Sequence, residues 1–345
     1  MVVPARELGH GRSIAVIQTA RLCRYRVYPR RLRHNECAMG VGDLSDATTN
    51  WKTQISRARS ALYKRIIYAM TRRGLSVLAK AKLESIKTLS YPSLSLVLPE
   101  RGFPLETRRS WANRRAHIRG KTVLIVGAGT GWEAPTWLSA GPFRIIALDL
   151  CPFVAAWKEI RSHYPSIHFL VARNEQLPVD DRSIDLIASD AVLEHCTDMP
   201  AVAREMMRAL RPGGYVYATY GPMWFCFGGD HFSSRGGDTH GYSHVELNLW
   251  AYRQYFEAHR LPDEDAQSGG RYVELDLFSK WTTSQYLECF RDIGFEIADL
   301  ILEISSRAVA FRHAWPQRFD AIAKRNNVDR DDLIIKGNLI LLRKP

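Results

Sequence analysis

Short apolar runs bounded by turn residues dominate the middle of the chain. Five of them lie between residues 121 and 220, and their length and composition are typical of buried parallel strands. They are Lys121–Val126, Phe143–Asp149, Ile167–Val171, Ile184–Ser189 and Tyr215–Tyr220. A helical pattern over Met199–Leu210 precedes the last run and ends at a Pro-Gly-Gly turn. Strands with helical crossovers predict an α/β fold with a doubly wound parallel sheet.

The N-terminal third follows a helical period instead. From Trp51 to Met70, apolar residues recur every three or four positions with basic residues between them, which predicts a basic amphipathic helix over residues 51–73 that ends at Gly74. A second helical stretch, Ser76–Leu89, is followed by three prolines that predict a linker. Such a basic helix packs on a neighbouring domain, lies on an anionic membrane surface or contacts nucleic acid phosphates, and the pattern leaves all three open.

The charge is concentrated in this same third. Residues 1–120 carry 24 basic and 7 acidic side chains, whereas residues 121–345 carry 24 and 29, so the net charge of +12 comes from the N-terminal part. Residues 1–42 hold eight arginines and no lysine, which indicates a loose basic arm. A transit peptide, or translation from a later start at Met39, would explain the same composition.

Composition excludes several classes of protein. The chain is 46% hydrophobic and 24% charged, which is ordinary for a globular protein, and no apolar stretch reaches the roughly 18 residues of a spanning helix. Its six cysteines form no C-x-x-C pair, which argues against a disulfide framework and a cysteine zinc site. We therefore expect a cytoplasmic protein with reduced thiols, with peripheral contact at a membrane surface left open.

A glycine-rich turn follows the first strand. Gly127, Gly129 and Gly131 have the spacing G-x-G-x-G, which lets a backbone approach a ligand. The dinucleotide fingerprint would need Gly or Ala where Trp132 stands. Asp149 ends the next strand 22 residues after Gly127, where a carboxylate can accept both ribose hydroxyls. An adenosine-bearing ligand is predicted.

The ordered motifs VGAGTG, ALD, EQLP, SIDLIASDAVLEH and MMRALRPGG over residues 121–220 resemble the class I S-adenosylmethionine-dependent methyltransferases, in particular the type 11-like branch. The segments LECFRDIGFEI and LIIKGNLILLR are similar to the helix, turn and final antiparallel hairpin of that family's seven-stranded sheet. The resemblance implies a Rossmann-like α/β domain over residues 105–345 with a lid insertion at about 221–280. Residues 1–45 would then be the basic arm, and residues 46–104 a helical extension with its linker.

The resemblance also implies a cofactor site for S-adenosylmethionine. The loop would approach the methionyl part, Asp149 would hold the ribose, and two residues would flank the adenine. The implied cofactor residues are Gly127, Ala128, Gly129, Gly131, Asp149, Leu150, Asn174, Glu175 and Asp190, the last beside the path of the methionyl chain. Ile125 and Arg173 depart from the family, which usually has acids at these two positions.

Histidines of the predicted lid are the candidates for activating an acceptor. A hydroxyl acceptor needs a base whose pKa lies near neutrality, so we expect His231, with Asp230 beside it, to take this role. His195 is the second candidate and His244 the third. The spacing of His231, Asp238, His240 and His244 matches no established zinc pattern, so no metal site is predicted.

These features favour an S-adenosylmethionine-dependent methyltransferase that acts on a small molecule, glycan or secondary metabolite, by O-methylation. RNA is a less favoured acceptor, suggested by the basic N-terminal region. A protein that binds the cofactor without catalysis is the third reading, prompted by Ile125 and Arg173. The acceptor's identity, the oligomeric state and the pathway do not follow from the sequence.

Overall fold

The computed structural model describes residues 89–99, 102–260 and 269–345. The predicted basic arm, the helix over residues 51–73 and residues 76–88 of the second helical stretch lie outside the described residues. Those predictions, and the domain boundaries built on them, stay predictions.

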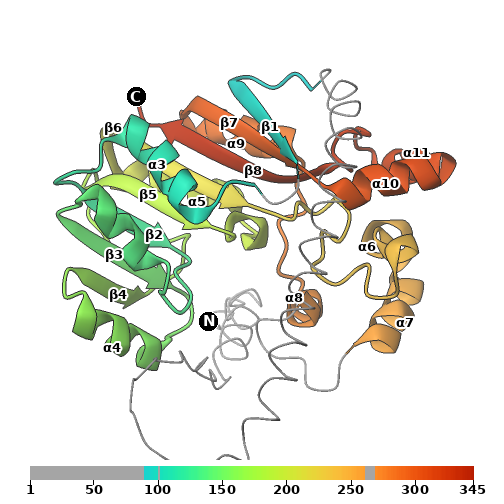
Figure 1. The fold of residues 1–345 in the computed structure, drawn as a ribbon, viewed down its shortest axis with the longest axis horizontal. Coiled ribbons are helices and arrows are strands. Elements are labelled where there is room, and N and C mark those ends of the chain that lie inside the picture. The colour runs from blue at the N-terminus through green and yellow to red at the C-terminus, as the bar shows by residue number, and fades with distance from the viewer. Residues whose placement is uncertain (1–88, 100–101, 261–268) are drawn as a thin grey trace, which may run out of the picture. The chain divides into compact units, whose positions relative to one another are not determined.

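One mixed sheet forms the centre of the described chain (Figure 1). Its strand order is β1-β7-β8-β6-β5-β2-β3-β4, in which β7 and β6 are antiparallel to β8 and the other neighbours are parallel. The strands are β1 Leu94–Pro99, β2 Thr122–Val126, β3 Arg144–Asp149, β4 Ile167–Val171, β5 Ile184–Asp190, β6 Leu210–Tyr220, β7 Glu296–Ile304 and β8 Ile335–Arg343. The predicted α/β fold class and all five central strands are confirmed.

The sheet has eight strands among the described residues, where seven were expected. The additional strand is β1, which pairs in parallel with β7 at the edge of the sheet. It occupies the proline-marked segment that the sequence assigns to a linker. An edge strand tolerates prolines because one of its sides needs no partner for its amides.

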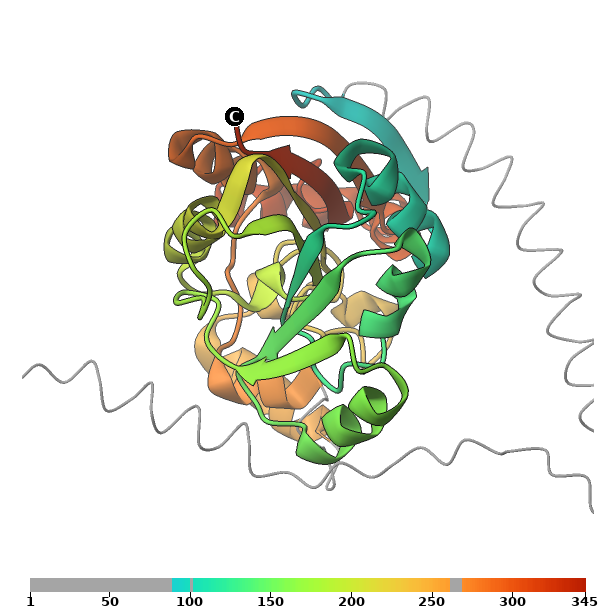
Figure 2. The same ribbon diagram turned by 90° about the vertical axis from the view of Figure 1, so that its left-hand side faces the viewer.

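Helices cover both faces of the sheet (Figure 2). Helix α3 and the 3-10 helix η1 pack together on one face, and α5 packs on α9 on the other. These elements, with α4 and the short η2, are α3 Leu105–Ala116, η1 Ala134–Ala140, α4 Val154–His163, η2 Leu193–His195, α5 Met199–Ala209 and α9 Thr283–Ile293. The limits of α9 follow from its sequence, since Thr282 and Gln285 form a capping box and Gly294 ends it in the left-handed conformation. None of the described helices combines the length and apolar character that a membrane crossing needs.

The segment after β6 builds a separate layer beside the carboxyl ends of β5 and β6 (Figure 1). It contains η3 Asp238–His240, α6 Ser243–Glu246, α7 Leu249–His259 and α8 Gly269–Leu275. We call the described residues 221–260 and 269–280 the lid. Phe232, Tyr255 and Phe256 form a small apolar core of its own.

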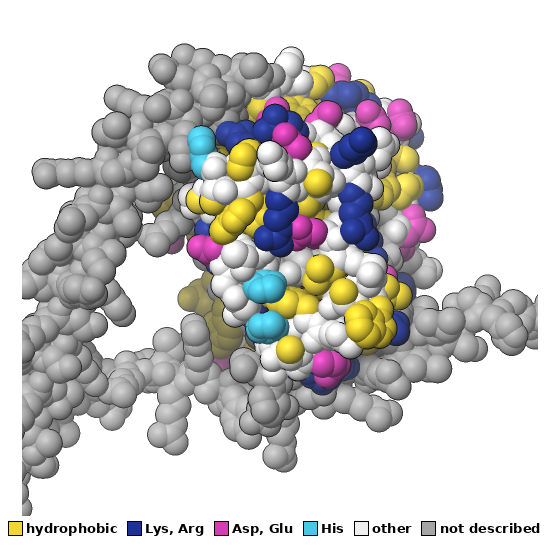
Figure 3. Space-filling view, turned by 90° about the vertical axis from the view of Figure 1, so that its right-hand side faces the viewer, with side chains coloured by type: hydrophobic (Ala, Val, Ile, Leu, Met, Phe, Trp, Pro, Cys, Tyr) yellow, Lys and Arg dark blue, Asp and Glu magenta, His cyan; other side chains and the backbone are white. Residues whose placement is uncertain are grey.

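The last two strands are not joined by a tight turn. Helices α10 Ser306–Ala314 and α11 Pro316–Asn326 lie between β7 and β8, so the expected antiparallel pair is present but its connection is helical. Figure 3 shows the face on which α6, α7, α10 and α11 lie, where exposed apolar side chains stand among basic ones. Leu249 and Trp250, at the start of α7, are 67% and 69% exposed.

Candidate active site

The glycine loop between β2 and η1 holds three residues in the left-handed region of backbone space. Gly127, Gly129 and Gly131 have φ angles of 70°, 53° and 84°, which residues with a Cβ seldom adopt. A Cβ at Gly127 would lie 2.3 Å from Val192, and one at Gly131 would lie 2.5 Å from Phe169. A Cβ at Gly129 would meet no atom of a non-neighbouring residue within 4 Å. Packing therefore requires the first and third glycines, while at the second the backbone faces open space.

The carboxylate of Asp149 is tied to this loop from the end of β3. The amide of Gly129 donates to Oδ2 over 2.7 Å, and the amide of Cys151 donates to Oδ1 over 2.9 Å. Burial raises the pKa of Asp149, although the amides of Cys151, Gly129 and Leu150 oppose this rise. The indole of Trp157 also donates to the carbonyl of Gly129 over 2.9 Å. The predicted ribose acid and the glycine loop thus form one polar unit, to which Leu150 contributes its amide.

Two candidates for the adenine end lie after β4. The side-chain amide of Asn174 donates from Nδ2 to the Cys196 sulfur over 3.8 Å, which links this turn to the residue after His195. Glu175 pairs with Arg173 at 3.5 Å, and both side chains are partly exposed. Arg173 therefore neutralises its neighbour, and Ile125, the other departure from the family, is a buried core residue of β2.

Asp190, at the end of β5, is engaged with protein groups. Its Oδ1 accepts from the Tyr217 hydroxyl over 2.7 Å and from Thr219 over 2.9 Å. Arg108 lies 3.2 Å from Oδ1, and Arg109 lies 2.7 Å from Oδ2. Both arginines belong to α3, so this carboxylate fixes α3 to the sheet. With both oxygens occupied, Asp190 has little capacity left for the methionyl chain of a cofactor.

His195 and His231 lie together beside the end of β5. Their ring centroids are 4.9 Å apart, although they are 36 positions apart in the sequence. Tyr272 of α8 stacks on His195 with a centroid distance of 4.2 Å and an interplanar angle of 12°. His195 Nδ1 lies 2.7 Å from the Leu277 carbonyl, so it carries the proton and Nε2 keeps the lone pair. His231 has a φ of 60°, a strained conformation of the kind found at functional sites.

Burial controls the protonation of this cluster. It lowers the pKa of His195, and burial together with His195 lowers the pKa of His231 to about 4. Burial raises the pKa of Glu194, which precedes His195, to about 8. At neutral pH both imidazoles are therefore uncharged and able to accept a proton.

The other predicted base, His244, lies in a different environment. Its side chain is fully buried, with Nε2 2.7 Å from the Trp224 carbonyl and Nδ1 3.1 Å from the Ser233 hydroxyl. Asp230 lies 3.7 Å from His244 and accepts from the amide and hydroxyl of Ser233 and from the hydroxyl of Tyr252. Burial alone would raise the pKa of Asp230, but these partners lower it. Asp230 thus belongs to the His244 network, and the expectation that His231 is the base, with Asp230 beside it, stays a prediction.

The fold does not bring all the lid histidines together. His240 stacks on Tyr255 at 5.1 Å, and Asp238 pairs with Arg307. His231 instead joins Glu194 and His195, whose ligand atoms all lie within 4.8 Å of one another.

The comparisons with known proteins bear on the glycine loop and the strands around it. Residues 124–218 match the family described as a methyltransferase domain. These residues thus form a methyltransferase domain, which supports the class I S-adenosylmethionine-dependent methyltransferases as the family that the motifs predict.

Named relatives agree with this assignment. Over 169 residues, the chain is 32% identical to a probable S-adenosylmethionine-dependent methyltransferase of Mycolicibacterium smegmatis, covering 47% of this chain and 62% of the relative. It is 35% identical over 97 residues to a malonyl-[acyl-carrier protein] O-methyltransferase of Serratia marcescens, covering 28% and 37%. It is 37% identical over 112 residues to a probable phthiotriol/phenolphthiotriol dimycocerosates methyltransferase 2 of Mycobacterium ulcerans, covering 31% and 43%. The chain spans less than two thirds of each of these relatives.

S-adenosylmethionine is the cofactor of this methyltransferase family, and the described residues fit it. A Cβ at Gly129 would extend into open space, which we call the cofactor cradle. The Asp149 carboxylate lies beside this space, because it accepts from the amide of Gly129. Asn174 and Glu175 follow β4, the strand next to β3, and their contact with the adenine stays a prediction.

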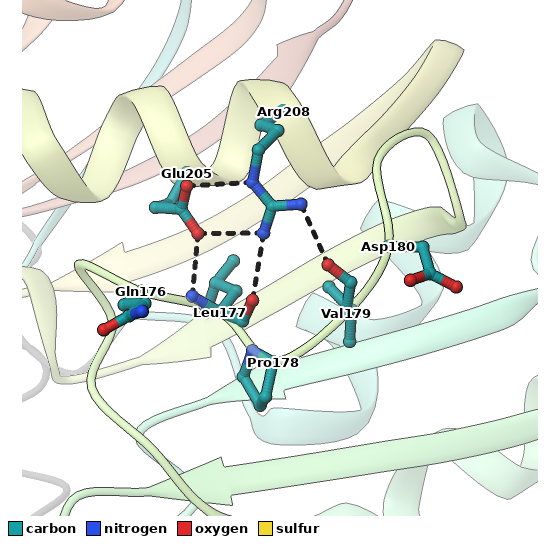
Figure 4. Close-up of a pocket in the computed structure, with 7 residues that line it drawn as sticks. All are labelled: Gln176, Leu177, Pro178, Val179, Asp180, Glu205 and Arg208. Atoms are coloured by element: carbon teal, nitrogen blue, oxygen red, sulfur yellow. Dashed lines mark hydrogen bonds and ion pairs between the residues drawn. The ribbon is translucent and has the colours of Figure 1, made fainter.

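Two methyltransferase motifs meet in a surface pocket of about 460 Å³ (Figure 4). Arg208 of α5 makes a paired contact with Glu205 and donates to the carbonyls of Leu177 and Val179, each over 2.9 Å. Glu205 in turn accepts from the amide of Leu177 over 2.8 Å. The L-P turn and the M-R-A-L helix are thereby joined by polar groups that saturate one another, which indicates a structural role for both motifs.

Sequence reasoning missed Glu194 and Tyr272 as members of the histidine cluster. Glu194 belongs to the L-E-H motif, in which the sequence interpretation assigned a role to His195 alone. Tyr272 belongs to a segment without a motif. Their proximity depends on how the lid folds back over η2, which no local pattern reports.

Proposed function

We propose that this methyltransferase domain transfers a methyl group to a hydroxyl of a small-molecule, glycan or lipid acceptor bound between η2 and the lid. The observation that carries the proposal is the pair of buried imidazoles, His195 and His231, whose ring centroids lie 4.9 Å apart beside the end of β5. The cofactor supplies an activated methyl group on a sulfonium. What remains for the protein is to bind the acceptor in line, exclude water and remove the hydroxyl proton.

The histidine pair is linked to the cofactor loop by short contacts. The amide of His195 donates to the Val192 carbonyl over 2.9 Å, and the side chain of Val192 lies against Gly127. Tyr272 stacks on His195. Burial raises the pKa of Tyr272, and the nearby carboxylates of Glu194 and Asp149 raise it further. These contacts support a methyl acceptor at the histidines while the nucleoside lies along Gly129 and Asp149.

His231 is the group that we propose to activate the acceptor hydroxyl. Its Nε2 is buried and without a hydrogen-bond partner among the described residues, so its position supports the role. Its pKa of about 4 leaves the ring uncharged, but makes it a weaker base than the near-neutral imidazole that the sequence predicts. His195 is the second candidate, with its Nε2 lone pair left available by the Leu277 contact. His244 is excluded from this role because both of its ring nitrogens are occupied.

The acceptor class rests on the relatives and on the lid. Two of the relatives named above act, by their names, on a malonyl-[acyl-carrier protein] and on phthiotriol or phenolphthiotriol dimycocerosates. Aromatic residues of the lid lie beside the histidines. The ring centroid of Phe278 is 5.6 Å from that of His195, and the ring centroid of Trp224 is 4.9 Å from that of Phe278. Such a lining suits an acceptor with an apolar portion. The RNA alternative depends on the basic N-terminal region, of which residues 1–88 lie outside the described residues.

Methyl-labelled S-adenosylmethionine tests the proposal. Purified protein is incubated with it and host extract, and the label is then partitioned among RNA, protein, lipid and small-molecule fractions. We expect label in the lipid or small-molecule fraction, lost in His231→Ala and retained in His163→Ala, a control on the exposed end of α4. Label in RNA would favour the alternative acceptor. A sample that binds the cofactor and labels nothing would support a binding protein without catalysis.

A further inference from the structure

Glu194, His195 and His231 form the one group of three metal-ligand side chains found in the described part of the chain. One ligand atom from each lies within 4.8 Å of the other two. The first two residues come from η2 and the third from the lid loop. We call these three residues the Glu-His-His cluster.

Three polar atoms of this cluster lack hydrogen-bond partners among the described residues. Glu194 is 3% exposed, and both of its carboxylate oxygens are buried and accept no hydrogen bond of ordinary geometry. Burial raises the pKa of Glu194, and the backbone amides of Glu194 and Gly221 lie near enough to oppose this rise. The Nε2 atom of His231 is also buried and unpartnered. Leaving three such atoms unsatisfied is costly, since each buried polar group without a partner has lost its hydrogen bonds to water. A ligand that satisfies all three at once would remove that cost.

His195 has the orientation that a metal ligand needs. Its Nδ1 donates to the Leu277 carbonyl over 2.7 Å, which leaves the Nε2 lone pair for coordination, and Tyr272 fixes the plane of the ring. A second hydrogen bond of this kind is typical of metal-bound histidines, because it sets the tautomer and the direction of the ring.

We propose that the Glu-His-His cluster binds one divalent transition-metal ion, with Zn²⁺ the best match to two imidazoles and one carboxylate. Three protein ligands of this composition leave coordination positions open, as in catalytic rather than structural zinc sites. Bonds of about 2.0–2.2 Å place the ligand atoms of one Zn²⁺ roughly 3–3.5 Å apart, so the side chains approach one another by about 1 Å on binding.

This site deepens the proposed function and rests on it for its chemical role. The open positions take the acceptor's oxygen, and the cation lowers the pKa of that hydroxyl so that its proton passes to solvent. The oxygen then forms a bond to the methyl carbon as the carbon–sulfur bond breaks, giving the methyl ether and S-adenosylhomocysteine. With the ion bound, His231 contributes to activating the hydroxyl as a ligand of the metal, in place of the direct proton transfer described under the proposed function.

Metal binding is measured on the full-length protein after chelation and dialysis, without any acceptor. Zn²⁺ binding is followed by calorimetry, and Co²⁺ serves as an optical probe because its visible absorption reports coordination. We expect one ion per chain in the wild type, with affinity reduced at least tenfold in Glu194→Gln and in His231→Ala. His163→Ala, on α4, should bind as the wild type does.

Melting curves establish that each variant is folded, and Glu194→Asp provides a second, shortened carboxylate in case the glutamine variant does not fold. Absence of stoichiometric binding by the folded wild type would overturn the metal site, and so would equal binding by the folded wild type and the cluster variants. Methyl transfer that persists in chelator, and still requires His231, would also overturn it while leaving the proposed function intact with His231 as the base. Stoichiometric binding without methyl transfer to any acceptor would support the metal site and contradict the proposed function.

Discussion

The cofactor region and the acceptor region of this domain are built from different parts of the chain. The cofactor region uses backbone: three glycines with positive φ, a set of amides and one carboxylate at a strand end, all between residues 126 and 151. The acceptor region uses side chains from η2, the lid loop and α8, which lie up to 78 positions apart. Substitutions in the cofactor region should therefore act through local steric clashes. Substitutions in the acceptor region should act through the loss of contacts between residues that are distant in the sequence.

Replacing His231 by Ala should have the largest effect on activity. We expect the turnover number to fall by about 10²–10⁴, the usual contribution of a group that activates a nucleophile, while cofactor affinity stays within a factor of two. Initial rates and calorimetric titration with S-adenosylhomocysteine measure the two quantities separately. A parallel loss of cofactor affinity would mean that the two regions are not separable in this way.

Replacing His244 by Ala should affect stability more than chemistry. Asp230 is fully buried and would lose the partner that helps to lower its pKa, so the free energy of unfolding should fall by about 3 kcal/mol. Denaturant unfolding monitored by tryptophan fluorescence measures the change. If the variant were as stable as the wild type but inactive, His244 would belong to the chemistry after all.

Cofactor affinity should depend on the ionisation of Asp149. Burial raises its pKa above the ordinary value of 3.8, and only the ionised carboxylate can accept both ribose hydroxyls. Affinity should therefore be constant at high pH and fall as the pH is lowered through the raised pKa. Asp149→Asn should bind about 10–100 times more weakly at neutral pH and lose this dependence, because hydrogen bonds to a charged acceptor contribute about 1.5–3 kcal/mol. Dissociation constants at successive pH values would show it, and a pH-dependent Asn variant would assign the titration to another group.

Gly129→Ala and Gly120→Ala form a matched pair with the smallest expected effects. Both glycines have positive φ, and a Cβ at either would meet no non-neighbouring atom within 4 Å. Each substitution should cost about 1 kcal/mol of stability through backbone strain. Only Gly129→Ala should also weaken cofactor binding, by about tenfold, because its Cβ points into the cofactor cradle. Equal cofactor affinities in the two variants would place the cofactor elsewhere.

The elements that local patterns specify were predictable from the sequence. Strands β2–β6 are short apolar runs, and the positions of Gly127 and Asp149 follow from the turn that joins them to the next element. Strand β1 was not predictable, because its prolines indicate a linker and only its pairing with β7 makes it a strand. The helices between β7 and β8 were missed because the resemblance to a final hairpin implied a short connection.

In the candidate site too, the contacts between residues on neighbouring strands were predictable and the contacts made by the lid were not. Asp149 and the loop glycines lie together as expected, since they follow neighbouring parallel strands. Asp190 is an exception, because the arginines of α3 occupy it and nothing in its own segment signals them. The contact of Glu194 with His231, and of Asp230 with His244, requires the lid to fold over η2, which adjacency in the sequence could not reveal.

The separation of the two regions is tested most directly by one paired measurement. Methyl transfer from labelled S-adenosylmethionine and equilibrium binding of the cofactor are measured in the same preparations of wild type, His231→Ala and Gly129→Ala. We predict that His231→Ala binds the cofactor normally and transfers no detectable label, whereas Gly129→Ala binds weakly but regains transfer at saturating cofactor. Normal transfer by His231→Ala would contradict the proposed acceptor site.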